Sequence, residues 1–516
     1  MPLPSPKRHL FLGFILGCLL LLLGGRTASA QEGTWSEPVS FGPYWFPDIA
    51  ADDTGQVHIV WSNSDAFYDM VMYSNSTYGV EWSDPLDVAA YQPLAGSEAT
   101  RPTILAGPDG ALYLSSRLTD IYVSRSSIWT NGTATGWSRP LAPVGEGYFS
   151  RMVLDHTGRL HLFYTQNLPD VVCLLCLRLY ATYSDDQGAS WNMPIDLSVI
   201  SNGTAKPQAI VDDQNNLHVV FETGPGGALG RVNEPSAVAY VTSSDRGDTW
   251  TMPVTLGPAE DAPPIDAAAA GAPIEVSARN IAIAARGNQL VTVWWSAADD
   301  LVYYQTSEDT GITWSKARSI PGIFGIWTLV ESRLDSYTMA TDSADNVHLV
   351  MVGRTGAQDK LVRLMHLVWG GRGWSQQTTI RGYTGDMPEW PRLAIGLGNQ
   401  LHLTWFVRDQ ASIFLSEAGK YEVYYARGLA DSPPIAPESL SAPTPEAQVA
   451  REEISDPGAA VPTIALTLAP AAKTPPPDTL SVEKLRTEND DVLLLLLSLL
   501  PATAVLIGIA IWRRRR

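Results

Sequence analysis

The sequence predicts an all-β fold, a β-propeller of four-stranded blades, on three observations. A tryptophan followed by a small polar residue recurs between residues 35 and 375, at spacings of about 47 to 64 residues that are typical of propeller blades. Between these tryptophans lie pairs of apolar strands joined by Asp, Asn or Gly turns, the sequence pattern of a β-hairpin. The array begins with a tryptophan element and ends with a strand pair, as expected of a closed ring.

Seven tryptophan elements mark the repeat. They contain Trp35, Trp82, Trp137, Trp191, Trp250, Trp314 and Trp374. The first of them precedes every strand pair, whereas the last strand pair, between residues 390 and 427, is followed by none. We therefore predict that the segment around Trp35 supplies the outer strand of the last blade, which closes the ring and removes its two open edges. The count is seven blades, with six as the alternative.

A histidine recurs in the strand that follows the hairpin turn. It is present in five repeats, as His58, His161, His218, His348 and His402. Because an equivalent position is distributed around a ring, these side chains are expected to support the fold and not to converge on one metal ion. No metal and no cofactor are expected.

The N-terminal end of the chain predicts export. Residues 1–30 contain basic residues at Lys7 and Arg8, an apolar stretch from Leu10 to Leu23, and small residues before Gln31. This is the layout of a secretory signal peptide. Cys18 lies in a faint lipoprotein-type motif, but leucines follow it where a polar tether is expected.

The C-terminal end predicts a membrane anchor. Residues 492–512 are an apolar run without a charged residue, long enough for a transmembrane helix. Residues 513–516 are arginines, which stay on the cytoplasmic side. Residues 432–491 are rich in Pro, Ala, Thr, Ser and Glu and are expected to form a disordered stalk. The sequence thus predicts a single-pass protein of the cell membrane whose propeller, residues 31–431, lies outside the cytoplasm.

The net charge and the cysteine content limit the classes of partner and of metal site that the sequence predicts. The formal net charge of −19 argues against nucleic acid, because neutralising phosphates needs a basic surface. The expected partners are the membrane, through the C-terminal helix, and a carbohydrate or protein ligand outside the cell. Cys173 and Cys176 have the spacing of half a zinc site, but the sequence holds no second pair. A local disulfide or two buried thiols is therefore favoured.

Three of the tryptophan elements share a longer motif. Residues 184–191, 243–250 and 307–314 follow the pattern Ser-x-Asp-x-Gly-x-Thr-Trp closely. This motif resembles the Asp box of the sialidase-like, or BNR-repeat, superfamily of propellers, and the resemblance extends over residues 33–427. It implies that these turns lie on the outer rim, away from the ligand face. Asp186, Asp245 and Asp309 are therefore expected to be structural residues of the Asp boxes.

Basic residues are the candidate ligand contacts. With the repeats in register, a basic residue lies near the start of most inner strands, on the face where propellers bind ligands. These residues are Arg101, Arg151, Lys206, Arg279 and Arg392, and loops after the second strands add Arg117, Arg231 and Arg354. Basic groups that converge near the central channel would suit a carboxylate or a sulfate. The alternative is that each is a solvated residue of its own blade.

The resemblance also implies a catalytic set. A sialidase of this superfamily holds the substrate carboxylate with three arginines and uses a tyrosine nucleophile that is activated by a glutamate. Glu222 is the candidate glutamate, and Tyr421 or Tyr424 is the candidate tyrosine. No complete series of these residues falls into place, and seven blades depart from the six of a sialidase.

Two functions of different class follow. The first is a surface-displayed, membrane-anchored module that binds glycans or another extracellular ligand without turnover. The second is a retaining exo-sialidase-type glycoside hydrolase. We favour the binding module because the motifs clearly predict the propeller scaffold, whereas the set of catalytic residues is incomplete. A scaffold that binds protein partners on its outer surface is a third alternative.

Overall fold

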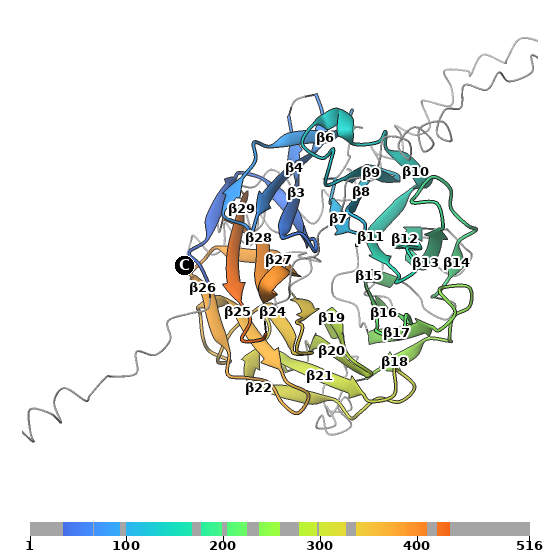
Figure 1. Ribbon diagram of the computed structural model, residues 1–516. Helices are drawn as coiled ribbons and strands as arrows, with labels where there is room; N and C mark the ends of the chain where they lie inside the picture. Colours follow the sequence, from blue (N-terminus) through green and yellow to red (C-terminus); the bar gives the residue numbers. More distant parts are fainter. Residues whose placement is uncertain are drawn as a thin grey trace, which may run out of the picture. The chain divides into compact units, whose positions relative to one another are not determined.

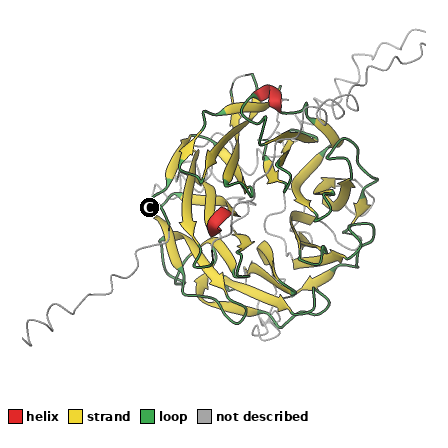
Figure 2. Ribbon diagram, in the orientation of Figure 1, coloured by secondary structure: helices red, strands yellow, loops and turns green. Residues whose placement is uncertain are grey.

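A seven-bladed β-propeller forms the body of the protein (Figure 1). The computed structural model describes residues 35–65, 67–92, 100–167, 177–198, 204–223, 237–257, 278–296, 299–326, 337–409 and 421–433. Strands dominate these residues, and short 3₁₀ helices lie at Ala134–Gly136 and Leu397–Asn399 (Figure 2). The prediction of an all-β propeller with seven four-stranded blades is therefore confirmed, and the alternative of six blades is wrong.

Each blade is an antiparallel sheet that runs from an inner strand near the axis to an outer strand at the circumference. Blade 1 contains β2 (Trp45–Ala51), β3 (Gln56–Ser64), β4 (Asp69–Thr77), β5 (Glu81–Trp82) and β6 (Leu86–Tyr91); blade 2 contains β7 (Thr103–Ala106), β8 (Ala111–Arg117), β9 (Ile121–Ser127) and β10 (Leu141–Val144); blade 3 contains β11 (Gly147–Leu154), β12 (Leu160–Asn167), β13 (Leu177–Ser184) and β14 (Ile195–Asp196). Blade 4 contains β15 (Thr204–Val211), β16 (Leu217–Thr223), β17 (Ala237–Ser243) and β18 (Val254–Leu256); blade 5 contains β19 (Ala278–Arg286), β20 (Gln289–Ser296), β21 (Leu301–Ser307) and β22 (Arg318–Phe324); blade 6 contains β23 (Tyr337–Thr341), β24 (Val347–Gly353), β25 (Val362–Trp369) and β26 (Thr378–Tyr383); blade 7 contains β27 (Met387–Gly396), β28 (Gln400–Arg408), β29 (Tyr421–Leu429) and β1 (Val39–Gly42). In blade 1 both β5 and β6 pair with β4, so the outer strand comes in two pieces.

The N-terminal segment closes the ring, as predicted. Strand β1 pairs with β29, with Val39 opposite Tyr425, and Trp35 forms a further bridge with Gly428. The first strand of the described chain is therefore the outer strand of the last blade. This pairing leaves no blade without neighbours on both sides.

The repeated tryptophans join neighbouring blades. Six of the seven lie edge-on to an aromatic ring of the preceding blade, with ring centroids 4.9 to 5.9 Å apart. The pairs are Trp35 with His366, Trp82 with Tyr425, Trp137 with Tyr73, Trp250 with Phe163, Trp314 with Tyr240 and Trp374 with Tyr304. An edge-to-face contact adds about 0.5–1.5 kcal/mol beyond the area it buries.

In blades 1, 4, 6 and 7 the recurrent histidine forms a hydrogen bond with one of these aromatic rings. In blade 4, His218 Nε2 lies 3.0 Å from Asp212 Oδ2, and its Nδ1 lies 2.8 Å from the hydroxyl of Tyr240. Oδ1 of Asp212 accepts the backbone N–H groups of Gln214 and Asn216 in the hairpin turn. One carboxylate therefore fixes the turn and the histidine together, and the histidine fixes the ring on which the next blade packs.

In blade 6 the equivalent histidine, His348, is part of a longer chain of hydrogen bonds, in which His366 takes the place of the tyrosine. The indole N–H of Trp35 donates to His366 Nδ1 at 3.4 Å, and His366 Nε2 lies 2.9 Å from His348 Nδ1. His348 Nε2 then lies 3.1 Å from Asp342 Oδ2. An indole only donates and a carboxylate only accepts, so each histidine must accept at Nδ1 and donate from Nε2. Every hydrogen bond of the chain is therefore formed when both histidines are neutral.

The Asp boxes form turns at the far ends of the blades from the inner-strand starts. In the first box, Asp186 Oδ1 accepts the N–H of Ser190 at 2.7 Å and the hydroxyl of Ser184 at 2.7 Å. The indole of Trp191 donates to the carbonyl of Gly188 at 3.2 Å. The boxes around Asp245 and Asp309 repeat the bonds to the carboxylate.

Replacing the box glycine Gly311 with alanine is expected to destabilise the propeller strongly. Its φ is +91°, and an added Cβ would lie 1.8 Å from the hydroxyl oxygen of Tyr240 in the preceding blade. Gly287→Ala is the matched control, because its φ is also positive but nothing lies within 4 Å of the added Cβ. We expect losses of about 1 kcal/mol for Gly287→Ala and about 2–4 kcal/mol for Gly311→Ala in chemical unfolding. Equal losses would contradict the interblade contact.

Acid should weaken the contact between blades 6 and 7. Burial, together with the neighbouring His348, lowers the pKa of His366 to about 3. The unfolded chain binds a proton at this residue below about pH 6.5, whereas the folded chain does not, so stability falls as the pH drops from about 6.5 towards 3.

His366→Tyr restores the residue found in blades 1, 4 and 7 and removes this titration. We expect the melting temperature of the variant to fall less steeply between pH 7 and pH 4 than that of the wild type. Some decline remains, because burial also lowers the pKa values of His161 and His402 to about 4. Parallel curves for the two proteins would show that His366 does not titrate with unfolding.

Candidate functional site

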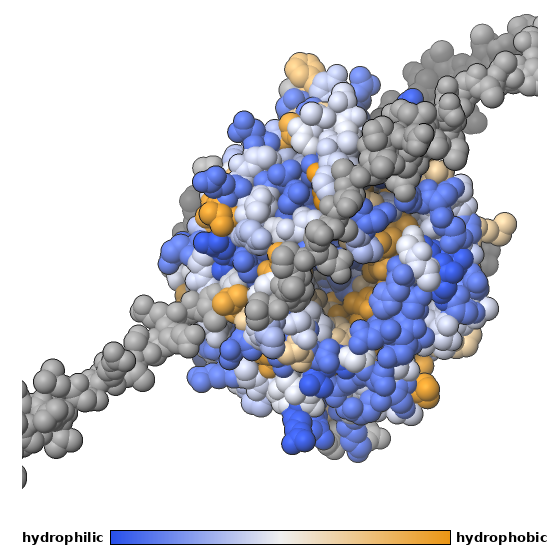
Figure 3. Space-filling model, in the orientation of Figure 1, coloured by the Kyte–Doolittle hydropathy of each residue, from blue (hydrophilic) through white to orange (hydrophobic). Residues whose placement is uncertain are grey.

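A pocket that opens to solvent lies where the inner strands of several blades begin. Its described lining residues come from blades 2, 3, 4 and 7: Arg101, Thr103, Arg117, Phe149, Ser150, Arg151, Lys206, Pro207 and Trp390. Four of these residues are basic and none is acidic. In the view of Figure 3, apolar residues gather beside the centre of the ring, while the circumference is mainly hydrophilic.

Three arginines from two adjacent blades face this pocket. The guanidinium carbon of Arg101 lies 4.9 Å from the ring centroid of Phe46. Arg117 lies 3.6 Å above the ring of Tyr148 and donates its Nε–H to the carbonyl of Gly147 at 2.8 Å. Arg151 donates its Nε–H to Gln208 at 3.3 Å. Stacking on rings and bonds from Nε orient guanidinium groups and reduce the ordering needed when an anion binds.

Lys206 lines the same pocket, but its charge is balanced. Its Nζ lies 3.3 Å from Glu222 Oε1, and both side chains are at most 5% exposed. The same carboxylate oxygen accepts the backbone N–H of Asn280 at 2.9 Å. Glu222 therefore links the start of β19 to Lys206 in the wall of the pocket.

A second buried ion pair lies beside the pocket, between blades 7 and 1. Arg392 stacks 4.0 Å from the ring of Trp390, and its Nε lies 3.7 Å from Asp48 Oδ1. Asp48 Oδ2 accepts the backbone N–H of Ile104 in blade 2. Burial raises the pKa of Asp48, although the charges of Arg392 and Arg151 oppose this shift.

The other basic residues predicted from the sequence lie elsewhere. Arg354 pairs with Asp300 at 3.4 Å and donates to the carbonyl of Gly325, so it joins blades 6 and 5. Arg279 is buried in β19, opposite Trp295, and is not among the described lining residues. Arg231, like Cys173 and Cys176, lies outside the described residues.

The two candidate tyrosines belong to blade 7. Tyr421 packs against Trp45, at a centroid distance of 5.6 Å, and against Phe406, while the guanidinium of Arg408 lies 5.5 Å from its ring. Tyr424 stacks on Trp405 at 5.7 Å. The bonds described for Glu222 go to Lys206 and Asn280 and not to either tyrosine. The catalytic roles of these three residues stay predictions.

A left-handed residue begins the inner strand in six blades. We call this residue the bulge position: it is Phe46, Arg101, Phe149, Lys206, Asn280 and Trp390, with φ between 28° and 58°. In five of these blades the pairing of the first two strands shifts register around it. A left-handed residue other than glycine costs of order 1–3 kcal/mol. Four of the six line the pocket.

Some pocket residues were not predicted from the sequence. Phe149 and Trp390 were missed, and Arg117 was placed only in a loop after a second strand. One sequence feature marks four of the six bulge positions, including the missed Trp390. A proline follows the bulge position in four blades, at Pro47, Pro102, Pro207 and Pro391.

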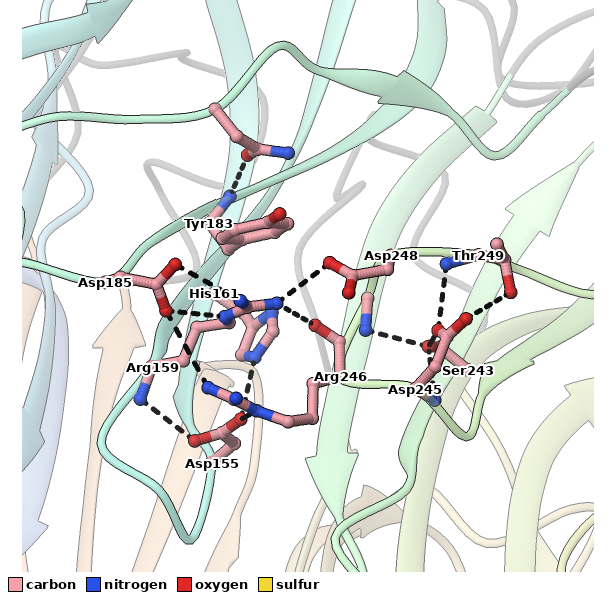
Figure 4. A network of polar contacts seen from close by, with 12 residues as sticks. Asp155, Arg159, His161, Tyr183, Asp185, Ser243, Asp245, Arg246, Asp248 and Thr249 are labelled. Atoms are coloured by element: carbon pink, nitrogen blue, oxygen red, sulfur yellow. Dashed lines mark hydrogen bonds and ion pairs between the residues drawn. The ribbon is translucent and has the colours of Figure 1, made fainter.

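The opposite face carries a polar network between blades 3 and 4 (Figure 4). Arg159 donates to Asp185 at 2.8 Å and to Asp248 at 3.0 Å, and its guanidinium lies 3.8 Å from the ring of Tyr183. Arg246 of the Asp box in blade 4 donates to Asp155 in the hairpin turn of blade 3 at 3.0 Å.

This network joins one hairpin turn to the next Asp box. Burial alone would raise the pKa of Asp155, but hydrogen bonds from Thr157 and Arg246 hold that pKa well below its usual range. The carboxylates of Asp185 and Asp248 are more than half exposed. The arrangement therefore stabilises the ring and offers no enclosed site.

Comparison with solved structures shows that this chain is similar to other propellers in fold. No family model and no curated protein matches the sequence. The BP39L lectin from Burkholderia pseudomallei is 13% identical, with a TM-score of 0.50, and the match covers 78% of this chain and 100% of the lectin. An ulvan lyase of polysaccharide lyase family PL25 is 11% identical, with a TM-score of 0.47, over 75% of this chain and 95% of the lyase. The NanB sialidase from Streptococcus pneumoniae is 13% identical, with a TM-score of 0.42, over 77% of this chain and 71% of the sialidase.

The seven four-stranded blades confirm the predicted propeller fold, and the match to the lectin, at a TM-score of 0.50, is a likeness of that fold. At identities of 11–13% the matches carry no information about which residues bind or react.

Arg159→Met is expected to destabilise the propeller. Losing its ion pairs and its contact with Tyr183 should lower the free energy of unfolding by about 1–2 kcal/mol. Arg139→Met, at an exposed arginine, is the matched control and should change stability by less than about 0.5 kcal/mol. Chemical unfolding measures both, and a loss no larger than the control's would contradict a stabilising role for the network.

Proposed function

We propose that this chain binds acidic carbohydrate, carrying a carboxylate or a sulfate, through the pocket at the inner-strand starts and does not hydrolyse it. The observation that supports this most directly is the set of three arginines, Arg101, Arg117 and Arg151, around a pocket whose described lining residues include no acid. The formal net charge of the chain is −19, so a cluster of basic residues does not follow from its average composition.

The chemistry of the lining fits such a ligand. A guanidinium group presents N–H donors in a planar fork that matches the oxygens of a carboxylate or a sulfate. Phe149 adds an apolar surface against which the C–H face of a sugar ring can pack. A pocket with these two components favours a charged sugar over a neutral one and over a small inorganic anion.

Turnover is less well supported than binding. A retaining sialidase-type mechanism needs a tyrosine whose proton a glutamate can accept. Glu222 is engaged by Lys206 and Asn280, and Tyr421 and Tyr424 pack on aromatic rings of blades 1 and 7. This arrangement favours a binding module.

Surface display is the second part of the proposal. It is based on the signal-like residues 1–30, the Pro-rich residues 432–491 and the apolar residues 492–512. These segments lie outside the described residues, among which no helix is long and apolar enough to cross a membrane.

The path of the chain at the end of the propeller supports an outward-facing pocket. Ser432 donates a hydrogen bond to Asp342, and the hydroxyl of Ser343 donates to the carbonyl of Pro433 at 2.9 Å. Asp342 and Ser343 lie in the turn that ends the inner strand of blade 6, whereas the pocket lies where inner strands begin. A chain anchored through its C-terminus would therefore leave from the face opposite the pocket.

Binding of 3′-sialyllactose, 3′-sulfated lactose and lactose to the purified full-length chain, measured by isothermal titration calorimetry, tests the proposal. The three probes share a core and differ in charge. At least one charged probe should bind at least tenfold more tightly than lactose, and Arg151→Met should remove most of this preference. Arg139→Met, a substitution at an exposed arginine, should leave it unchanged.

Equal affinities for the three probes would contradict the proposal. Release of the sugar from a fluorogenic α-sialoside by the same preparation would instead support the hydrolase, provided that Glu222→Gln abolished it.

A further inference from the structure

Two consecutive aromatic residues at the start of β11 lie side by side. In a regular strand the side chains of consecutive residues point to opposite faces of the sheet. Here the pairing of β11 with β12 shifts register between Tyr148 and Ser150, and the residue between them, Phe149, has a φ of 28°. The ring centroids of Tyr148 and Phe149 are 5.6 Å apart. The bulge in blade 3 thus places two aromatic rings next to each other beside the pocket.

Tyr148 contacts two of the three pocket arginines, and both of them belong to blade 2. The guanidinium carbon of Arg117 lies 3.6 Å from the ring centroid of Tyr148, and that of Arg101 lies 5.9 Å from it. Arg101 also lies 5.6 Å from the ring centroid of Phe149. A guanidinium group within about 6 Å of a ring centroid is attracted to the negative face of that ring. One tyrosine of blade 3 therefore attracts two cations of the neighbouring blade.

Hydrogen bonds bring the same residues together. The carbonyl of Gly147, the residue before Tyr148, accepts the Nε–H of Arg117 at 2.8 Å. The backbone N–H of Arg117 donates to the carbonyl of Thr100, the residue before Arg101, at 2.7 Å. The backbones of the two arginines are therefore held close to each other, and their guanidinium groups carry like charges. Attraction of both groups to the ring of Tyr148 favours this placement.

We propose that Tyr148 is the positioning residue of the pocket, whose ring holds Arg117 and Arg101 in the orientation in which they bind the carboxylate or sulfate of the ligand. This inference rests on the proposed function. The described lining residues of the pocket include both arginines but not Tyr148, so the tyrosine acts through the arginines. A guanidinium group that is oriented before the ligand arrives loses less conformational freedom on binding. The ring therefore raises the affinity for a charged sugar and leaves the affinity for a neutral one unchanged.

Substitution of Tyr148 in the full-length chain tests the inference by isothermal titration calorimetry. The charged probe is whichever of 3′-sialyllactose and 3′-sulfated lactose the wild type binds more tightly. Tyr148→Leu should weaken binding of this probe by roughly five- to tenfold and change the affinity for lactose by less than about twofold. Tyr148→Phe keeps the ring and should recover most of the lost affinity. Tyr148→Met gives the same test if Tyr148→Leu does not fold, because methionine also lacks an aromatic face.

Tyr183→Leu is the matched control. Tyr183 is half-buried, and its ring centroid lies 3.8 Å from the guanidinium carbon of Arg159 in the network on the opposite face. This contact has the same chemistry as the contact between Tyr148 and Arg117. Its loss should lower the melting temperature and leave the affinity for the charged probe within about twofold of the wild type.

A double-mutant cycle asks whether Tyr148 acts through Arg117. Arg117→Met alone should weaken the charged probe. If the tyrosine acts by orienting this arginine, the double variant should lose less affinity than the product of the two single losses.

Three results would overturn the inference while the proposed function stands. The first is a Tyr148→Leu variant that binds the charged probe as tightly as the wild type. The second is a pair of losses that multiply in the double variant, because Tyr148 then acts independently of Arg117. The third is a Tyr148→Phe variant as weak as Tyr148→Leu, which would assign the effect to the hydroxyl. A wild type that binds neither charged probe more tightly than lactose overturns the proposed function and this inference together.

Discussion

The edge-on contact between a tryptophan and an aromatic ring of the preceding blade is the interaction on which the rest of the structure depends. Propeller blades touch only their neighbours, so the ring is as strong as its interblade contacts. The tryptophan belongs to one blade and the ring it meets to the preceding blade, where hydrogen bonds can fix the ring, as Asp212 and His218 fix Tyr240. Trp35 makes the same contact where the chain closes on itself. Six such contacts, at about 0.5–1.5 kcal/mol each, are comparable to the whole net stability of a typical domain.

This arrangement divides the molecule into two faces with different tasks. The hairpin turns, the Asp boxes and the network around Arg159 occupy one face, where the carboxylates of Asp185, Asp186 and Asp212 accept hydrogen bonds from an arginine or from turn backbone. The other face holds the inner-strand starts, where six left-handed residues and several basic side chains lie. Strain is tolerated there because the surrounding sheets are rigid. In the proposed function, stability and ligand contact are thus assigned to opposite ends of the same strands.

Much of the fold could be predicted from the sequence, because the repeat is local. Tryptophan spacing, hairpin turns and the unpaired Trp35 element suffice for seven blades and for their closure. The site was predicted only in part. Arg101, Arg151 and Lys206 lie in the pocket, but Arg354 pairs with Asp300 and Arg279 is buried in β19. In blade 5 the register shifts between Arg279 and Ala282, around the bulge position Asn280, and a one-residue change of register turns a side chain to the other face of the sheet. The pairing of Asp48 with Arg392 depends on ring closure, which brings together residues more than 300 positions apart.

A crystal structure of the chain with 3′-sialyllactose bound tests the central claim, that acidic carbohydrate is bound at the inner-strand starts. The claim predicts that the carboxylate lies within hydrogen-bond distance of at least two of Arg101, Arg117 and Arg151 and that the sugar ring packs on Phe149. A ligand bound at the outer circumference, or at the face of the Asp boxes, with this pocket filled only by water, would contradict it.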